Sequence, residues 1–427
     1  MSTTSSTSTV NRWVVLGASV AILLCAGVIY SFSVFAIPLV QENEGWTMGQ
    51  VMNAFIINGA IAPIPMILGG YIIDRGGARW SIMIGAILFV TGFALTGTAT
   101  TLTQLYLYYG LIAGLGVGFT YSGCLNNTIK LFPDRRGFAA GVITAGMGAG
   151  TVIAAPIARG LIADVGVGQT FVRMGMVYAV IVIVASLFIR PAPVGYVPAG
   201  WTPPVAVAGA APVNKTWREM LANPQFYVIF LMLTAGAFSG LLIVSQLSPI
   251  AQTASFGITA ATAAVLVSVY SICNASGRFV WGAVSDRIGY VNATMVMYTV
   301  VALSMVVLLT MQSQIGFTIG IIGLGLCFGG VMGVFPALTM KTFGPRFQGV
   351  NYGILFTGYS IAAYFGPKIG SSLGGINPAD PASSEYTGTP FVIAIGVAAA
   401  GLVCAVILTR MMKAQERSRD ARELSAV

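Results

Sequence analysis

Long apolar runs, interrupted only by short polar segments, dominate this chain of 427 residues. Hydrophobic residues make up 56% of the sequence and charged residues only 8%. A soluble protein needs about a quarter of its residues charged to solvate its surface. Because one membrane span needs about 20 apolar residues, the apolar share is enough for roughly twelve spans and leaves little over. We therefore expect an all-α membrane protein without a large soluble domain.

Apolar length, with charges and turn residues marking the loops, places the spans. We predict them at 13–40, 48–73, 80–99, 102–130, 137–163, 170–190, 225–253, 258–284, 291–312, 315–341, 349–375 and 389–412. A segment rich in proline, glycine and alanine separates six spans from six. The predicted organisation is an N-terminal tail (1–12), two six-helix bundles (13–190 and 225–412), a cytoplasmic linker (191–224) and a C-terminal tail (413–427).

Basic residues indicate the orientation. Of the 21 Lys and Arg residues, 17 fall at the termini or in even-numbered loops, so both termini are predicted to be cytoplasmic. The formal charge of +9 is thus a topology signal, and we expect no nucleic-acid partner. The five cysteines lie in apolar runs without metal-binding spacing, and we expect neither a metal nor a cofactor. We expect a monomer in the lipid bilayer of a bacterial inner membrane.

An internal repeat relates the two halves. The stretch "GGYIIDRGGAR" (69–79) recurs as "WGAVSDRIGY" (281–290), with Asp74 and Asp286 lying 212 residues apart. The same offset relates Gly137, which opens the fifth span, to Gly349, which opens the eleventh. Two homologous six-span halves follow from this repeat.

These motifs resemble the major facilitator superfamily, whose loop between spans two and three has the pattern G-x-x-x-D-R-x-G-x-R. The matching residues are Gly70, Asp74, Arg75, Gly77 and Arg79, and the second half keeps Gly282, Asp286, Arg287 and Gly289. The resemblance implies two pseudo-symmetric bundles. An Asp at a helix C-terminus opposes the helix dipole unless basic partners hold it. We therefore predict a conformational switch formed by Gly70, Asp74, Arg75, Arg79, Asp286 and Arg287, the alternative being solvated loop charges.

Arg278 is the most informative residue inside a span. All twelve acidic residues lie in loops, termini or span ends, and histidine is absent. Arg278 lies eight residues before Asp286, or about 12 Å into the bilayer at about 1.5 Å per residue. An unpaired cation at that depth suits an anionic substrate, and its planar fork can hold a carboxylate with two hydrogen bonds. The alternative is that Arg278 snorkels or binds helix carbonyls.

Other polar side chains can complete such a site. Asn274 lies one turn from Arg278 on the same helix face and can bind the substrate or orient the guanidinium. Tyr30, Tyr121 and Tyr359 fall near the middle of spans one, four and eleven, beside small residues. Each couples a hydroxyl to an apolar ring, which suits a small acid with an alkyl group, although lipid-facing packing is the alternative. Lys368 lies late in span eleven, where snorkelling is expected.

Within the superfamily, the chain resembles monocarboxylate transporters and the related oxalate/formate antiporter-type carriers. The resemblance rests on "NRW" (11–13), "YSFSVFAIPL" (30–39), "LFPDRRGFAAG" (131–141), Arg278 and "NYG" (351–353). It implies that Arg278 binds a substrate carboxylate and that Tyr30 and Tyr121 are pocket aromatics. The chain departs from these carriers at Asn274, Val34 and Tyr359, where they have an acid or a lysine. One arginine without a second cation favours a monocarboxylate over oxalate.

We therefore expect a carrier of small monocarboxylates such as lactate or pyruvate, working by rocker-switch alternating access. Proton symport is implied by the resemblance only, because the central membrane contains no carboxylate or histidine. The alternatives are a carboxylate anion exchanger of the oxalate/formate type and a sugar or drug carrier. We expect no enzyme, because the sequence offers no paired carboxylates, nucleophile and base, metal cluster or phosphate loop.

Overall fold

The computed structural model describes residues 10–193, 195–198, 200–202, 213–244, 246–376 and 384–424. Within these residues the chain is helical, and ten helical runs are long and apolar enough to cross a membrane. The protein is an all-α, multi-pass integral membrane protein. Most of the predicted N-terminal tail and the middle of the predicted linker, 203–212, lie outside the described residues.

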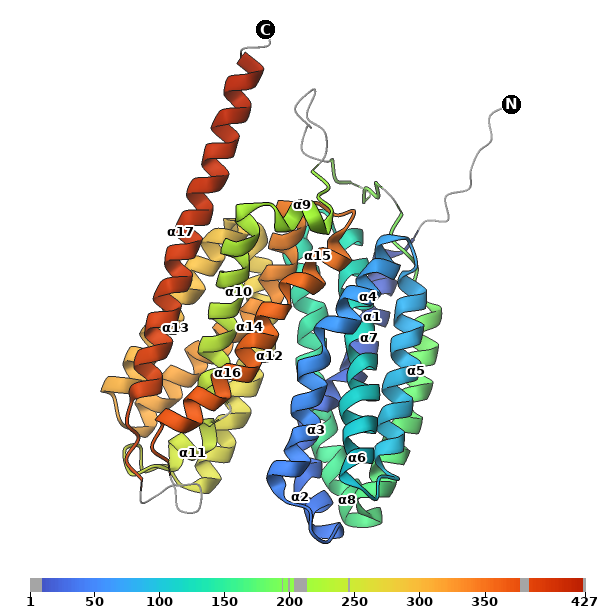
Figure 1. Ribbon diagram of the computed structural model, residues 1–427, viewed down its shortest axis with the longest axis vertical. Helices are drawn as coiled ribbons and strands as arrows, with labels where there is room; N and C mark the ends of the chain where they lie inside the picture. Colours follow the sequence, from blue (N-terminus) through green and yellow to red (C-terminus); the bar gives the residue numbers. More distant parts are fainter. Residues whose placement is uncertain are drawn as a thin grey trace.

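The N-terminal half contains ten helical elements (Figure 1). They are α1 (Arg12–Ala26), the 3₁₀ segment η1 (Gly27–Ser31), α2 (Phe32–Glu42), α3 (Met48–Ile61), α4 (Pro63–Asp74), α5 (Ala78–Thr96), α6 (Leu102–Leu105), the π-helical segment η2 (Tyr106–Ala113), α7 (Gly114–Leu131) and α8 (Arg136–Leu187).

The C-terminal half repeats this arrangement. Its elements are α9 (Trp217–Leu221), α10 (Pro224–Val244), α11 (Leu247–Gln252), α12 (Ala260–Ile288), α13 (Tyr290–Thr310), α14 (Gln314–Phe343), α15 (Gln348–Leu355), α16 (Thr357–Leu373) and α17 (Thr389–Leu424). The predicted C-terminal tail, 413–427, is thus helical as far as Leu424, and α9 lies inside the predicted linker.

Two features relate the ten runs to the twelve predicted spans. Helix α8 has 52 residues, about 78 Å at 1.5 Å per residue, and is too long for one crossing. It bends sharply at Gly166, whose φ of 79° is unfavourable for a residue with a side chain. The carboxylate of Glu42 accepts a hydrogen bond from the amide of Val167 (3.0 Å), which caps the segment after this bend. The eleventh predicted span is divided at Phe356 into α15 and α16. Counting α8 as two spans and α15–α16 as one accounts for twelve.

Local sequence signals explain where several helices begin. Thr47 with Gln50, Thr101 with Gln104, and Thr216 with Glu219 form reciprocal capping boxes at α3, α6 and α9. Asn11 caps α1 through the amides of Trp13 and Val14.

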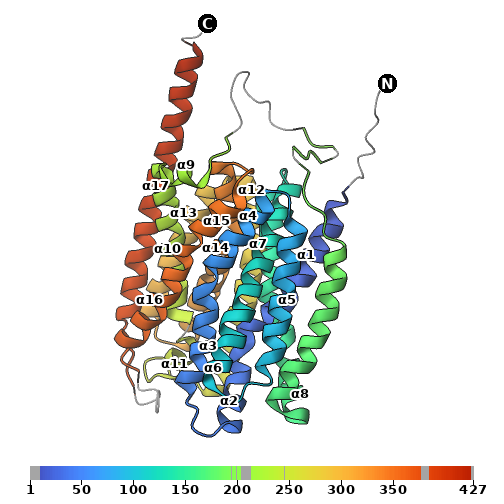
Figure 2. The same ribbon diagram turned by 45° about the vertical axis from the view of Figure 1, so that its right-hand side comes forward.

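The two halves lie side by side, and α1 begins and α17 ends at the same end of the molecule (Figures 1 and 2). We call this end the terminal side. Contacts between the halves are most extensive where α8 packs on α12 and α4 packs on α15. One apolar cluster extends across the interface and includes Met66 of the first half with Met332, Phe335 and Phe356 of the second. The structure is therefore closed at the terminal side.

Candidate functional site

Arg278 is buried at the interface between the halves, with 8% of its surface exposed. Its Nε donates to Oδ1 of Asn274 (3.2 Å) on the same helix, α12. Its Nη1 donates to the carbonyl of Thr144 (2.8 Å) on α8, in the other half. Nη2 has no hydrogen-bond partner among the described residues and does not belong to their fully buried unpaired atoms. No described carboxylate forms an ion pair with Arg278. Part of its donor capacity thus remains free for a ligand.

Helix packing positions this guanidinium. Gly148 of α8 faces the charged group, since a Cβ added there would lie in ordinary contact with Cζ of Arg278 (3.5 Å). At Gly141 of α8 and Gly333 of α14, an added Cβ would overlap the carbonyl of Arg278 itself. The Arg278 backbone is therefore held between two helices from opposite halves.

Four tyrosines lie near this charge. Arg278 acts electrostatically on the hydroxyls of Tyr121, Tyr270, Tyr352 and Tyr359. The buried hydroxyls of Tyr121 and Tyr352 interact with each other, and that of Tyr270 interacts with Asn274, but none of the three makes a hydrogen bond of standard geometry among the described residues. An unpaired buried hydroxyl costs about 1–3 kcal/mol. These three hydroxyls, which make no hydrogen bond of standard geometry, suit a polar ligand that satisfies them beside the partly free guanidinium.

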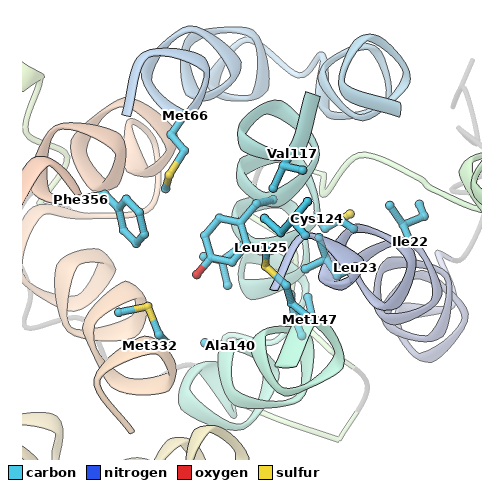
Figure 3. Close-up of a cluster of buried hydrophobic side chains, with 14 of the residues drawn as sticks. Ile22, Leu23, Met66, Val117, Cys124, Leu125, Ala140, Met147, Met332 and Phe356 are labelled. Carbon is cyan, nitrogen blue, oxygen red and sulfur yellow. The ribbon is translucent and has the colours of Figure 1, made fainter. Parts of the chain in front are cut away.

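Apolar side chains pack against these tyrosines. The ring of Phe356 stacks on Tyr359 (centroids 4.8 Å apart) and lies 6.1 Å from the ring of Tyr121. Figure 3 shows Met66, Met332 and Phe356 reaching toward the centre of the cluster from helices of both halves. The break between α15 and α16 at Phe356 places these aromatics. The site thus combines one cation, several hydroxyls and a flexible apolar lining.

The structure brings the five predicted substrate-binding residues together. Asn274 bonds to Arg278, and Tyr121 and Tyr359 lie within its electrostatic range. Tyr30 acts on both of these tyrosines and is 40% exposed, so it lies at the accessible side of the group. Their role in binding stays a prediction. Lys368 is exposed and donates to the hydroxyl of Tyr364 (2.7 Å) on its own helix.

Asp74 forms a contact between the halves at the terminal side. Its Oδ1 accepts from Nζ of Lys130 and from the amide of Gly349 (both 3.0 Å), and its Oδ2 accepts from the amide of Val350 (3.1 Å). The carboxylate therefore caps the N-terminus of α15, where a negative charge complements the helix dipole. Gly70 allows this approach, because a Cβ there would overlap the backbone of Gly349.

Asp286 makes the symmetry-related contact. Its two carboxylate oxygens accept from the amides of Gly137 and Phe138 (both 2.8 Å) at the start of α8, and Oδ1 also accepts from Tyr290 (2.9 Å). A Cβ at Gly282 would overlap the carbonyl of Gly137. The repeat offset of 212 residues thus describes two matching contacts between the halves.

The basic residues of the predicted switch lie differently from our expectation. The partner of Asp74 is Lys130, whereas Arg75 stacks over the ring of Tyr71, 3.7 Å from its centroid. Nε of Arg79 is buried without a hydrogen bond, and Arg287 is exposed. Backbone N–H groups of the opposite half bind both carboxylates. Such partners cannot be predicted from the types of side chain in the sequence.

Sequence reasoning missed several members of the site. Tyr270 lies four residues before Asn274 and eight before Arg278, so helical spacing could have found it. Tyr352 belongs to the "NYG" segment, but an apolar helix gives no sign of which tyrosines face inward. The carbonyl of Thr144 has no sequence signal, because it becomes a partner only when the halves meet.

A bundle of this kind, with a polar group enclosed between two repeated halves, is the architecture of a membrane transport protein. The sequence pattern of the Major Facilitator Superfamily matches residues 18–367 and, in a second alignment, 247–425. The chain belongs to this superfamily. It is accordingly a transporter rather than an enzyme.

Several known proteins are similar to the chain. The oxalate:formate antiporter of Oxalobacter formigenes is 30% identical over 371 residues, with 85% of each chain covered. Monocarboxylate transporter 12 of Rattus norvegicus is 27% identical over 242 residues, covering 52% of this chain and 49% of that protein. Among solved structures, the transporter FucP in the outward conformation has a TM-score of 0.65 at 16% identity, covering 92% of this chain and 98% of its own. That likeness shows the fold alone.

Proposed function

We propose that this transporter carries small monocarboxylates such as lactate or pyruvate by alternating access. The observation that carries the proposal is the partly free guanidinium of Arg278 near buried tyrosine hydroxyls that make no hydrogen bond of standard geometry. A carboxylate can bind the free N–H groups and accept from the hydroxyls, while an alkyl group packs against the methionines and Phe356.

The charge balance favours a substrate with a single carboxylate. Arg278 is the one cation within electrostatic range of the tyrosine group among the described residues, since Lys368 binds a tyrosine of its own helix. One bound anion neutralises it, whereas a dicarboxylate would leave a negative charge inside the membrane, which is costly.

In the proposed mechanism, the substrate enters while the terminal side is closed and leaves after the halves rock apart there. The Lys and Arg distribution supports cytoplasmic termini, so the described state is closed to the cytoplasm. The anion must bind the occluded state more tightly than the open states, because equal affinity would shift no population.

Uptake of labelled lactate into proteoliposomes tests the proposal. Arg278→Lys keeps the charge but loses the planar fork, so we expect weak uptake, and Arg278→Ala should have none. Arg159→Ala, which removes an exposed arginine of α8, is the matched control and should transport normally. Normal lactate uptake by Arg278→Ala would refute the proposal.

The coupling mode has two candidates. We propose proton symport, with the proton carried beside the bound anion, because the site offers no described carboxylate to hold it. Exchange of one carboxylate for another is the second candidate, favoured by the similarity to an oxalate:formate antiporter. An imposed pH gradient should raise lactate uptake by a symporter. An exchanger should respond instead to carboxylate preloaded inside the vesicles.

A further inference from the structure

An apolar groove of about 570 Å³ opens on the outer face of the N-terminal half, between α1 and the last turns of α8. Its volume lies in the range of small-molecule sites, about 300–1,000 Å³. Helix α1 contributes Val14, Gly17 and Ala21, helix α8 contributes Val180 and Val184, and Phe188 follows the end of α8. The exposed fractions of Val180 and Phe188 are 64% and 53%. The groove is separate from the site around Arg278.

Small residues of α1 create the space without using it for packing. A Cβ at Gly17 would meet nothing within 4 Å. Where α1 does pack against α8, at Gly150, an added Cβ would overlap the carbonyl of Leu24. Small residues in membrane helices ordinarily allow close helix contact. At Gly17 the helices stay apart, so an apolar group from outside the protein must fill the gap.

The location of the groove indicates its occupant. From Val14 to Ala21 it extends about 10 Å along α1 from the terminal side, which falls within one leaflet of a hydrocarbon core about 30 Å thick. Arg190 follows Phe188 by two residues, and its side chain is exposed. Asn127 holds the Arg190 backbone by donating to its carbonyl (2.8 Å). No described carboxylate pairs with this arginine.

We propose that the groove binds one acyl chain of an anionic phospholipid from the leaflet on the terminal side, with the headgroup phosphate bound to Arg190. The apolar lining suits the chain, and a fixed cation beyond the groove suits an anionic headgroup more than a zwitterionic one. The nearby Arg12 is already paired with Asp134 (2.6 Å), which leaves Arg190 as the available partner.

Native mass spectrometry of the purified protein with phosphatidylglycerol or phosphatidylcholine tests this site. Wild type should retain one phosphatidylglycerol that survives delipidation. Gly17→Leu should lose that lipid, because the new side chain occupies open space in the groove and needs no repacking. Gly396→Leu is the matched control, since Gly396 of α17 is also an exposed membrane glycine with nothing within 4 Å, and it should keep the lipid.

Arg190→Gln separates the headgroup from the chain. It should lose the preference for phosphatidylglycerol over phosphatidylcholine while the groove still accepts an acyl chain. Retention of the lipid by Gly17→Leu would overturn the site. A dimer that disappears in Gly17→Leu would also overturn it, because a second copy would then fill the groove. Equal retention of both lipids by wild type would overturn the role of Arg190.

Discussion

At the scale of single residues, a buried hydroxyl without a partner is a better guide to function than one that is satisfied. Tyr352 is fully buried and its hydroxyl has no hydrogen bond of standard geometry, whereas Tyr298, equally enclosed, donates to the carbonyl of Met232 (2.5 Å). Burial of the Tyr352 hydroxyl lowers the stability of the substrate-free protein, whereas the hydrogen bond of Tyr298 stabilises the fold.

Phenylalanine substitutions should separate these two roles. Tyr352→Phe removes a hydroxyl whose contact with Tyr121 falls short of hydrogen-bond geometry, so we expect little change in melting temperature, together with substrate affinity reduced about two- to tenfold by the lost hydrogen bond. Tyr298→Phe should lower the melting temperature and leave affinity unchanged. Thermal unfolding and lactate binding, measured on both variants, check this. Unaltered affinity in Tyr352→Phe would remove that tyrosine from the site.

From the sequence, the site residues that could be predicted are those marked by their depth in the membrane and by a charged or polar side chain. Arg278 stands out because a cation deep in a span is costly, and Asn274 follows from helical spacing. The partners of Arg278 on α8 could not be predicted, since a backbone carbonyl and the space at Gly148 arise only from the packing of two distant segments. Tyr270 and Tyr352 share the apolar surroundings of the other tyrosines in the chain.

At the scale of elements, apolar length predicts the spans and the loop between 163 and 170 in which α8 bends, but not the break inside the eleventh span. Helix α8 joins two predicted spans through Gly166, and α15 and α16 divide one predicted span at Phe356. Apolar composition is similar on both sides of Phe356, so tertiary packing decides that break. Lys130, the partner of Asp74, is 56 residues away and was likewise not predictable.

The helix caps between the halves should control the closed state. In Asp74→Asn and Asp286→Asn the side chain keeps one oxygen instead of two. It can therefore accept from only one of the two adjacent backbone N–H groups. Each substitution should cost about 0.5–2 kcal/mol of closed-state stability. The measurement is double electron–electron resonance between two spin labels, attached to cysteines introduced at Trp80 and Arg346 in a protein whose five native cysteines are replaced. The distance between the two labels should lengthen in each variant. Both positions are exposed at the terminal side.

Asp164→Asn is the control for this experiment, because it neutralises an exposed carboxylate near the bend of α8. Its label distances should equal those of wild type. If Asp74→Asn and Asp286→Asn also keep the wild-type distances, the caps do not hold the halves together.

At the scale of the whole molecule, the repeat in the sequence predicts two related halves, and the structure arranges their contacts with the same symmetry. Which side of the molecule is closed was not predictable. The same residues line both states of an alternating-access carrier, and the states differ by only a few kcal/mol. A local sequence pattern does not predict so small a difference in free energy.

Gly70 and Gly282, which allow the close contacts between the halves, should therefore control closure of the terminal side. A single added side chain at either position should destabilise the closed state. Gly70→Val and Gly282→Val each place atoms where the backbone of Gly349 or Gly137 now lies, while the packing within each half is untouched. Overpacking by about 1–3 kcal/mol should reduce the ratio of closed to open molecules about 5- to 150-fold, lengthen the Trp80–Arg346 distance and slow uptake, with little change in melting temperature. Gly396→Val, in open space on α17, should behave as wild type. Because the two contacts are equivalent by symmetry, both variants should shift the distance in the same direction. A shift in only one of them would mean that a single contact closes the terminal side.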